Sequence, residues 1–275
     1  MILLRRVESY EKVGEFVREA FELFSPKLES EVLVKPNFLQ FESPESGCIT
    51  HPEVVKAVID VLRERGHEVV VAEGGFYRDS ADKCFDEFGL RELAECVNIN
   101  TEELVRVEVN GKALKEVEAG KNILKAMNSP FISLPKMKVH TLAVTTLGIK
   151  NNMGFLKKPA MYMHLKIHQK LVDLLHILNP ALTIVDGVIG GAGSESSTTP
   201  VHHGVMVAGD NVIEVDAVSS YLMGFEPEKI GYIRKASEEF GVDLENIEVR
   251  GDDPDELRVD YSRNFLGRVL GKFSW

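Results

Sequence analysis

Blocks of apolar residues along the chain alternate between two periodicities, which predict strands and helices in turn. Short apolar runs bounded by Gly or Pro are typical of buried strands, and apolar positions three and four residues apart are typical of helices. The predicted strands are residues 2–7, 31–35, 68–72, 131–134, 182–185, 205–208 and 247–249. The predicted helices are residues 10–24, 51–65, 165–178, 213–223 and 230–240. This order predicts an α/β fold with a mainly parallel, doubly wound sheet and helices on both faces.

Turn and capping residues refine this picture at two places. Thr50 is the expected N-cap of the second helix, Glu53 completes a capping box, and Gly66 ends the helix. Asn110-Gly111 lies between two strand-like runs and is a strong hairpin signal, which suggests a small inserted subdomain at about residues 100–125. We expect a single α/β domain over residues 1–250, followed by a charged, loosely attached C-terminal tail over residues 251–275.

The composition is that of an ordinary globular protein, with 44% hydrophobic and 27% charged residues among 275. Cys48, Cys84 and Cys96 include no C-x-x-C pair, which fits a reducing compartment and excludes a Cys-ligated iron–sulfur cluster within this chain. The N-terminus is too poor in apolar residues for a signal peptide, and no apolar run approaches membrane-spanning length. We therefore expect a cytoplasmic protein with no membrane partner. Abundant Glu and Lys with scarce Gln resemble a thermophilic composition.

The charge is distributed unevenly. The formal net charge of −11 argues against nucleic acid as a partner. Residues 136–170, however, contain seven Lys and three His but no Asp or Glu. A basic island in an acidic protein indicates a local site for a small anion that bears phosphate or carboxylate, although a solvated basic face explains it nearly as well.

Polar side chains follow several of the predicted strands, at the edge where open α/β sheets bind their ligands. They are Lys35 and Asn37, Glu73, the group Lys136, Lys138 and His140, Asp186, and Asp210. If these strands are parallel, all of these groups face one rim. Each of them taken alone is better explained as a turn former or a cap, and only the cluster favours a site.

Candidate roles follow from side-chain chemistry. The expected ligand-binding residues are Lys35, Asn37, Lys136, Asn151, Asn152, Gly191 and Gly193, and the expected catalytic residues are Lys138, His140, Lys150 and Asp186. Lysines supply charge to an anion, amides orient it, and crowding lowers the pKa of a lysine enough to make it a nucleophile or base. An equally good alternative is that Lys138 and Lys150 form structural ion pairs with Glu73 or Asp186.

Two weaker signals complete the set. The glycine-rich stretch 186–194 follows a strand, and its amides are expected to cradle an anion, while the Ser/Thr-rich residues 194–199 form either a mobile lid or a plain surface loop. His164 and His168 have the spacing of a metal-binding pair on one helix face, although a plain helix edge explains them better. A bound metal ion therefore stays an open alternative.

The runs Lys136-Met137-Lys138-Val139-His140 and Lys150-Asn151-Asn152-Met153-Gly154 also carry a family resemblance. Together with Lys35-Pro36-Asn37, His51-Pro52-Glu53 and Asp186-Gly187, they make the chain similar to the domain of unknown function 362 family from about Glu31 to Asp216. Many members of that family carry a ferredoxin-like module with iron–sulfur clusters, which this chain lacks.

Three functions are compatible with these observations. The first is an enzyme acting on a small anionic metabolite in a crevice rich in Lys, His and Asn. The second, implied by the fused modules of the family, is a metal- or cofactor-dependent redox accessory protein that works with a separate ferredoxin. The third is a non-enzymatic ligand-binding module.

Overall fold

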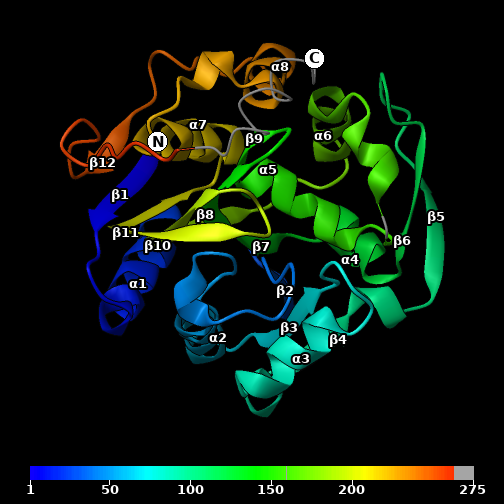
Figure 1. Cartoon of the computed structure of the whole chain (residues 1–275). Helices are drawn as coiled ribbons and strands as arrows, with labels where there is room; N and C mark the ends of the chain where they lie inside the picture. The colour runs from blue at the N-terminus through cyan, green and yellow to red at the C-terminus, as the bar shows by residue number, and fades with distance from the viewer. Residues whose placement is uncertain (159, 263–275) are drawn as a thin grey trace.

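The computed structural model describes residues 1–158 and 160–262, and a ten-stranded sheet forms the centre of this part (Figure 1). A second, two-stranded sheet consists of β5 (Leu104–Glu108) and β6 (Glu116–Gly120). The strands of the large sheet are β1 (Ile2–Arg6), β2 (Glu31–Pro36), β3 (Glu68–Glu73), β4 (Glu95–Asn98), β7 (Phe131–Leu134), β8 (Lys136–His140), β9 (Val144–Thr146), β10 (Leu182–Gly193), β11 (Thr198–Gly209) and β12 (Val249–Gly251). The α-helices are α1 (Val13–Phe24), α2 (Pro52–Glu64), α3 (Ser80–Glu87), α4 (Asn122–Asn128), α5 (Gly148–Asn151), α6 (Ile167–Leu175), α7 (Val212–Leu222) and α8 (Gly231–Phe240).

The sheet combines a parallel half with an antiparallel edge. Its strand order is β12-β1-β11-β10-β7-β2-β3-β4, with β8 pairing β10 and β9 outside this path. The strands from β10 to β4 run parallel, while β11 runs antiparallel to both β1 and β10. The predicted mainly parallel α/β sheet is therefore confirmed. Because β11 is reversed, Asp210 follows it at the opposite edge, so the prediction that Asp210 joins the other polar groups is wrong.

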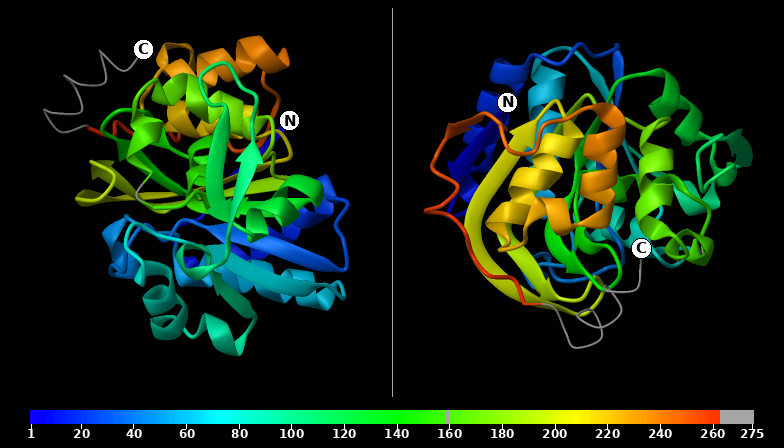
Figure 2. Two further views of the ribbon diagram at one scale, coloured as in Figure 1. Left: turned by 90° about the vertical axis from the view of Figure 1, so that its right-hand side faces the viewer. Right: turned by 90° about the horizontal axis from the view of Figure 1, so that it is seen from above.

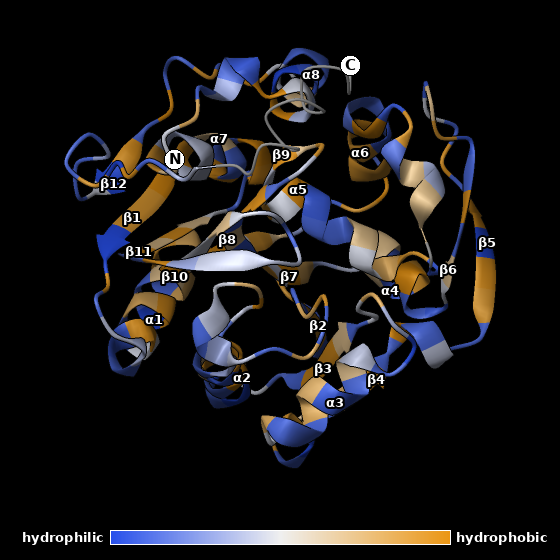
Figure 3. Ribbon diagram, viewed as in Figure 1, coloured by the Kyte–Doolittle hydropathy of each residue, from blue (hydrophilic) through white to orange (hydrophobic). Residues whose placement is uncertain are grey.

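Helices cover both faces of the sheet. On one face α1, α2 and α3 bury Phe21, Ile59 and Phe85, and on the other α5, α6 and α8 bury apolar residues of a second core. Figure 2 shows the two helical layers from the side, and Figure 3 shows hydrophobic central strands between helices whose outer surfaces are hydrophilic. No helix in residues 1–158 and 160–262 combines the length and the apolar character needed to span a bilayer.

The N-cap of α2 differs from the prediction. His51 caps the helix, with its Nδ1 accepting from the Glu53 amide at 3.2 Å. The Thr50 hydroxyl accepts instead from the Asn37 amide at 2.9 Å and donates to the Leu134 carbonyl at 2.6 Å. Thr50 thus joins the chain segments that leave β2 and β7, and the cap moves one residue along the chain.

The predicted hairpin is confirmed as the separate two-stranded sheet of β5 and β6. Asn110, at a positive φ of 56°, precedes the turn, which the Gly111 amide closes by donating to the Leu114 carbonyl at 2.9 Å, so Lys112 and Ala113 form its tip. The buried Asp173 of α6 accepts hydrogen bonds from the amides of Lys112, Ala113 and Leu114 at 3.1, 2.6 and 2.7 Å. These three bonds fasten the hairpin loop to the helical layer.

The glycine-rich stretch is a strand rather than an anion-binding loop. β10 and β11 are twelve residues each and pair along most of their length, so the glycine-rich stretch forms no cradle. The loop expected at residues 194–199 is shorter, because only residues 194–197 connect the two strands. The right-hand view of Figure 2 shows how strongly this hairpin curves. A Cβ on Gly191 would lie 2.4 Å from the Gly47 carbonyl, so the strand needs glycine there for packing.

The start of the C-terminal tail is firmly packed, contrary to the expectation of loose attachment. The amides of Val259 and Tyr261 donate to the carbonyls of Leu222 and Met223 at 2.8 and 3.0 Å. The Tyr261 side chain is 1% exposed. The remainder of the tail, residues 263–275, lies outside the described residues.

Candidate functional site

A pocket of about 550 Å³ opens where β2, β3 and β8 end. Its lining comes from the segments after β2 and β3, from β8 and α5, and from the turn between β10 and β11. The parallel direction of β2, β3 and β7 brings the first of these segments to one edge, as expected for an open α/β sheet. Among the predicted site residues, it is lined by Asn37, Lys138, His140, Lys150, Asn151 and His164.

Lys35 and Glu73 form a buried ion pair beside the pocket. The Glu73 carboxylate also accepts from the amides of Gly74 and Gly75 at 2.8 and 3.0 Å. The Lys35 ammonium donates further to the Pro36 carbonyl at 2.8 Å and to Asn151 Oδ1 at 3.3 Å. Both charges are thereby compensated by partners within the protein, so the ion pair is a structural link between β2, β3 and α5.

Lys138 is anchored by carbonyl groups instead of by a carboxylate. Its ammonium donates to the carbonyls of Cys48 and Glu195 at 2.6 and 3.1 Å, and the side chain is almost fully buried. Burial lowers its pKa. The alternative that Lys138 pairs with Glu73 or Asp186 is therefore wrong, and its charge is left uncompensated by a hydrogen-bonded carboxylate.

Lys150 lies in the same pocket with a free amine. Within residues 1–158 and 160–262, its ammonium makes no hydrogen bond or ion pair. Burial lowers the pKa of Lys150 to about 7, with Glu195 acting in the opposite direction and the positive charge of Lys138 adding to the decrease. Burial, more than the predicted crowding of lysines, therefore leaves part of the Lys150 amine neutral near pH 7. The alternative pairing of Lys150 with Glu73 or Asp186 is wrong as well.

Lys158 is a third, half-buried cation that the sequence did not single out. Its ammonium donates to the Met153 carbonyl at 2.8 Å, and burial lowers its pKa to about 8. Its position within the basic island was the only signal in the sequence. Lys138, Lys150 and Lys158 line one pocket, and together with Lys35 they face the carboxylates of Glu73 and Glu195.

His140 is held as a neutral hydrogen-bond donor. Its Nδ1 accepts from the amides of Leu142 and Ala143 at 3.1 and 3.0 Å, which places the ring proton on Nε2. Burial and the nearby charge of Lys150 lower its pKa well below the ordinary value. The turn that supplies these amides ends at Val144, a β-branched residue at φ 73°, which marks local backbone strain beside the site.

Glu195 is the acidic residue of the pocket that the sequence did not reveal. It comes from the turn between β10 and β11, and its Oε2 accepts from the amide and hydroxyl of Thr141 at 3.0 and 2.8 Å. Burial opposes its ionisation, but these hydrogen bonds outweigh burial and lower its pKa. Its Oε1 lies 3.7 Å from His140 Nε2. A single acidic residue in a Ser/Thr-rich turn carries no recognisable spacing signal.

The rest of the pocket is apolar or carries unused polar atoms. Leu39, Phe76, Tyr77, Met153 and Met161 line it, and Phe76, Tyr77 and Met161 are exposed at 46, 64 and 61%. The buried Oδ1 of Asn37 and Oγ1 of Thr146 have no hydrogen-bond partner among the described residues. Buried polar atoms without partners are costly, so these two are available to a ligand.

Lys136 and Asp186 lie elsewhere, as a second buried ion pair with an N–O distance of 2.7 Å. The Tyr10 hydroxyl bridges them, donating to Asp186 Oδ1 at 3.1 Å, and the His51 amide donates to Asp186 Oδ2 at 2.8 Å. Lys136, Lys138 and His140 belong to strand β8, although the sequence predicted that the strand ended at Pro135. Neither Lys136 nor Asp186 lines the pocket of about 550 Å³ that contains Lys138, Lys150 and Lys158, which we call the lysine pocket.

The remaining predicted residues are also outside the pocket. The Asn152 side chain donates to the Leu178 carbonyl at 2.7 Å, and Gly193 ends β10. His168 belongs to α6 and is buried against Tyr232 of α8, whereas His164 belongs to a preceding 3-10 turn. Lys166, at φ 57°, separates the two histidines, so they do not share a helix face. In the described part of the chain, no three His, Cys, Asp or Glu side chains gather as a metal site.

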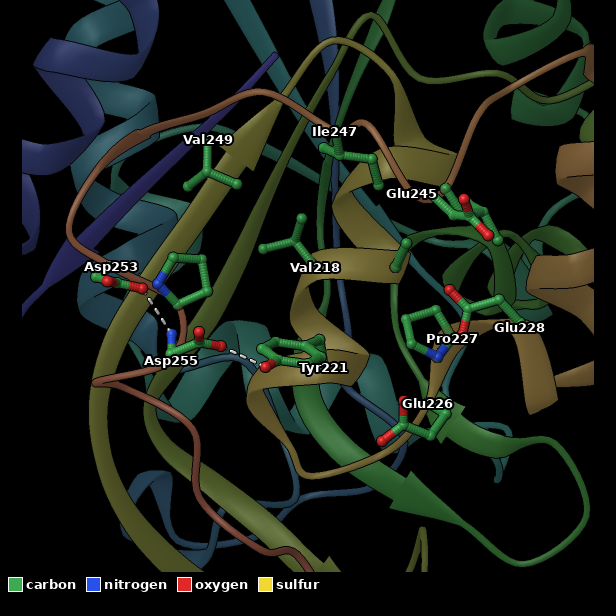
Figure 4. A pocket seen from close by; sticks show the side chains of 13 residues that line it. Val218, Tyr221, Glu226, Pro227, Glu228, Glu245, Ile247, Val249, Asp253 and Asp255 are labelled. Atoms are coloured by element: carbon green, nitrogen blue, oxygen red, sulfur yellow. Dashed lines mark hydrogen bonds between the residues drawn. The ribbon is translucent and has the colours of Figure 1, made fainter.

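Another pocket, of about 370 Å³, has the opposite electrostatic character (Figure 4). Its charged lining consists of Glu226, Glu228, Glu245, Asp253 and Asp255. The Tyr221 hydroxyl donates to Asp255 within it. Because all of the charged side chains that line it are acidic, this pocket does not suit the anion predicted from the sequence.

Comparisons with known proteins identify a family but no solved fold. The family model described as domain of unknown function DUF362 matches residues 32–221. The thylakoid-associated protein sll1697 of Synechocystis sp. is 26% identical over 248 residues, which cover 83% of this chain and 76% of that protein. No solved structure matches the chain.

Proposed function

This chain belongs to the domain of unknown function 362 family, and we propose that it is an enzyme whose lysine pocket binds a small anionic metabolite. The observation that carries the proposal is the excess of cations in that pocket. Lys138, Lys150 and Lys158 line it without an ion pair to any described carboxylate. In a chain of net charge −11, so local a positive excess favours a phosphate- or carboxylate-bearing ligand.

The neutral groups of the pocket support the same ligand. His140 Nε2 offers a proton to an oxyanion, and the unpartnered amide oxygen of Asn37 can accept a hydrogen bond from a hydroxyl group elsewhere on the same molecule. The apolar side formed by Phe76, Tyr77 and Met161 suits a carbon skeleton attached to the anionic group. Pockets that combine apolar walls with a few convergent polar groups are typical of small-molecule sites.

A thermal-shift screen tests binding. Phosphate, sulfate, citrate and a set of phosphorylated and carboxylated metabolites are compared for their effect on the Tm of the wild type. Because a ligand that binds only the folded state stabilises it, at least one anion should raise the Tm. The Lys150→Met variant should lose this shift, and the matched Lys166→Met variant, altered at an exposed lysine, should keep it.

Catalysis is tested separately from binding. Each compound that raises the Tm is incubated with the protein and followed by proton NMR. Conversion supports an enzyme, whereas a ligand that stays unchanged supports the alternative of a non-enzymatic binding module. A wild type whose Tm responds to no anion, or a Lys150→Met variant that responds fully, would contradict the proposal.

A further inference from the structure

We infer that Lys150 is a nucleophile that forms an imine with an anionic substrate bearing an aldehyde or ketone group, an inference that rests on the proposed anion pocket. The pocket contains one lysine whose amine is not used by the protein. The ammonium of Lys35 is bound to Glu73, and those of Lys138 and Lys158 are bound to carbonyls. That of Lys150 has no hydrogen bond within the described residues.

The backbone around Lys150 is held rigidly. The buried Asp216 of α7 accepts from the amides of Gly148 and Ile149 at 2.7 and 3.0 Å, and thereby caps the start of α5. A Cβ on Gly148 would lie 2.5 Å from Val212, so α5 packs closely on α7. Asn151, next to Lys150, donates to the Lys35 carbonyl at 3.0 Å. These contacts position the Lys150 amine at the pocket without occupying it, as a nucleophile requires.

The neighbouring charges suit a substrate with two functional groups, an anionic group and a carbonyl group. Lys138 and Lys158 line the same pocket as cations for the anionic group, and burial lowers the pKa of Lys150 to about 7, which leaves part of it as the neutral amine. A neutral amine attacks a carbonyl carbon, whereas an ammonium does not. A pocket that only neutralised an anion would gain nothing from a deprotonated lysine.

The atoms needed for imine formation are present. The Lys150 nitrogen attacks the carbonyl carbon and the carbonyl electron pair moves to oxygen. Glu195, the carboxylate of the same pocket whose charge acts on Lys150, accepts the proton that the amine releases. His140 Nε2 donates a hydrogen bond to the developing oxyanion, and its 3.7 Å separation from Glu195 Oε1 puts both groups at one end of the pocket. Glu195 passes this proton to the oxyanion, which gives the carbinolamine. The C–O bond then breaks as its hydroxyl group takes the second proton of the original amine, so an amine and a carbonyl become an imine and water.

Reductive trapping tests the inference directly. The wild type is incubated at about pH 7 with glyoxylate, an anionic aldehyde, and sodium cyanoborohydride, and the modified lysines are mapped by mass spectrometry. Lys150 should be modified at least about tenfold faster than exposed Lys166. Acetaldehyde, which is neutral, should lose this preference, and sulfate should protect Lys150 from glyoxylate.

The Glu195→Gln variant separates reactivity from binding. It should still bind sulfate, because it loses only a negative charge from the pocket, but it should form the Lys150 adduct several-fold more slowly. If wild-type Lys150 reacts no faster than Lys166 while sulfate still binds, the imine is excluded and the anion pocket remains. If neither sulfate nor any other anion binds, the proposed function fails as well.

Discussion

At the scale of single residues, the partner of each buried lysine determines what that lysine does. Lys35 is paired with a carboxylate, Lys138 is bound by two carbonyls, and the Lys150 amine makes no hydrogen bond or ion pair with the part of the chain that the structure describes. All three lie in or beside the same pocket, and burial lowers the pKa of each. Their sequence contexts are similar, so only the folded chain distinguishes an anchor from a reactive group.

This distinction predicts that two similar substitutions change the free energy of unfolding by different amounts. Lys138→Met leaves the carbonyls of Cys48 and Glu195 without their donor, and each unsatisfied buried group costs about 1–3 kcal/mol. Lys150→Met removes a half-buried amine that has no partner among the described residues, and should change the free energy of unfolding by less than about 1 kcal/mol or increase it. Urea unfolding of both variants measures this difference, and equal destabilisation would contradict the assigned roles.

The same comparison has a predictable dependence on pH. The folded-state pKa of Lys150, about 7, is below the ordinary value of 10.5 in the unfolded chain, so the unfolded state binds more protons between these values. The stability of the wild type relative to Lys150→Met should therefore rise as pH increases from about 7 towards about 10. Unfolding curves at several pH values test this, and a constant difference would show that the pKa of Lys150 is not lowered.

At the scale of elements, a four-residue helix depends on a carboxylate from another helix. Asp216 caps α5, and burial raises the pKa of Asp216 to about 7, against the effect of the two amides that it accepts from. Asp216→Ala should lower the free energy of unfolding by about 2–4 kcal/mol and weaken anion binding, because α5 carries Lys150. Asp216→Asn, which keeps one acceptor oxygen, should retain more of both. Anion binding unchanged in a folded Asp216→Ala variant would show that the cap does not position Lys150.

Elements with strong local periodicity were predictable from the sequence, whereas those set by distant contacts were not. The apolar stripe of α1 and the Asn110-Gly111 turn are local signals, and both elements are confirmed. The glycine-rich β10 was misread because its glycines serve close packing against Gly47 and Tyr261, which are remote in the sequence. Part of the candidate site followed from the rule that polar groups gather at strand ends, which brought together Asn37 and Glu73, whereas Lys138 lies within β8.

At the scale of the whole molecule, the described part of the C-terminal segment belongs to the folded body. Tyr261 is buried, and its hydroxyl lies 3.0 Å from His203 Nδ1 on β11. Tyr261→Ala removes a large buried side chain and should cost about 3–5 kcal/mol. Thermal unfolding measures this loss, and the exposed Tyr77→Ala should have little effect as a control. A small loss on Tyr261→Ala would indicate that the segment is only loosely attached after all.

The central claim is that buried lysines bind an anion in an otherwise acidic protein, and proton-linked calorimetry tests it most directly. Sulfate is titrated into the wild type and into Lys150→Met and Lys166→Met, in two buffers of different ionisation enthalpy, from about pH 6 to about pH 9. An anion favours the protonated lysines, whose pKa values are about 7 for Lys150 and about 8 for Lys158. Wild type and Lys166→Met should bind with proton uptake and lose affinity as pH rises through this range, and Lys150→Met should bind weakly. Absence of binding, or binding that Lys150→Met and pH leave unchanged, would contradict the account.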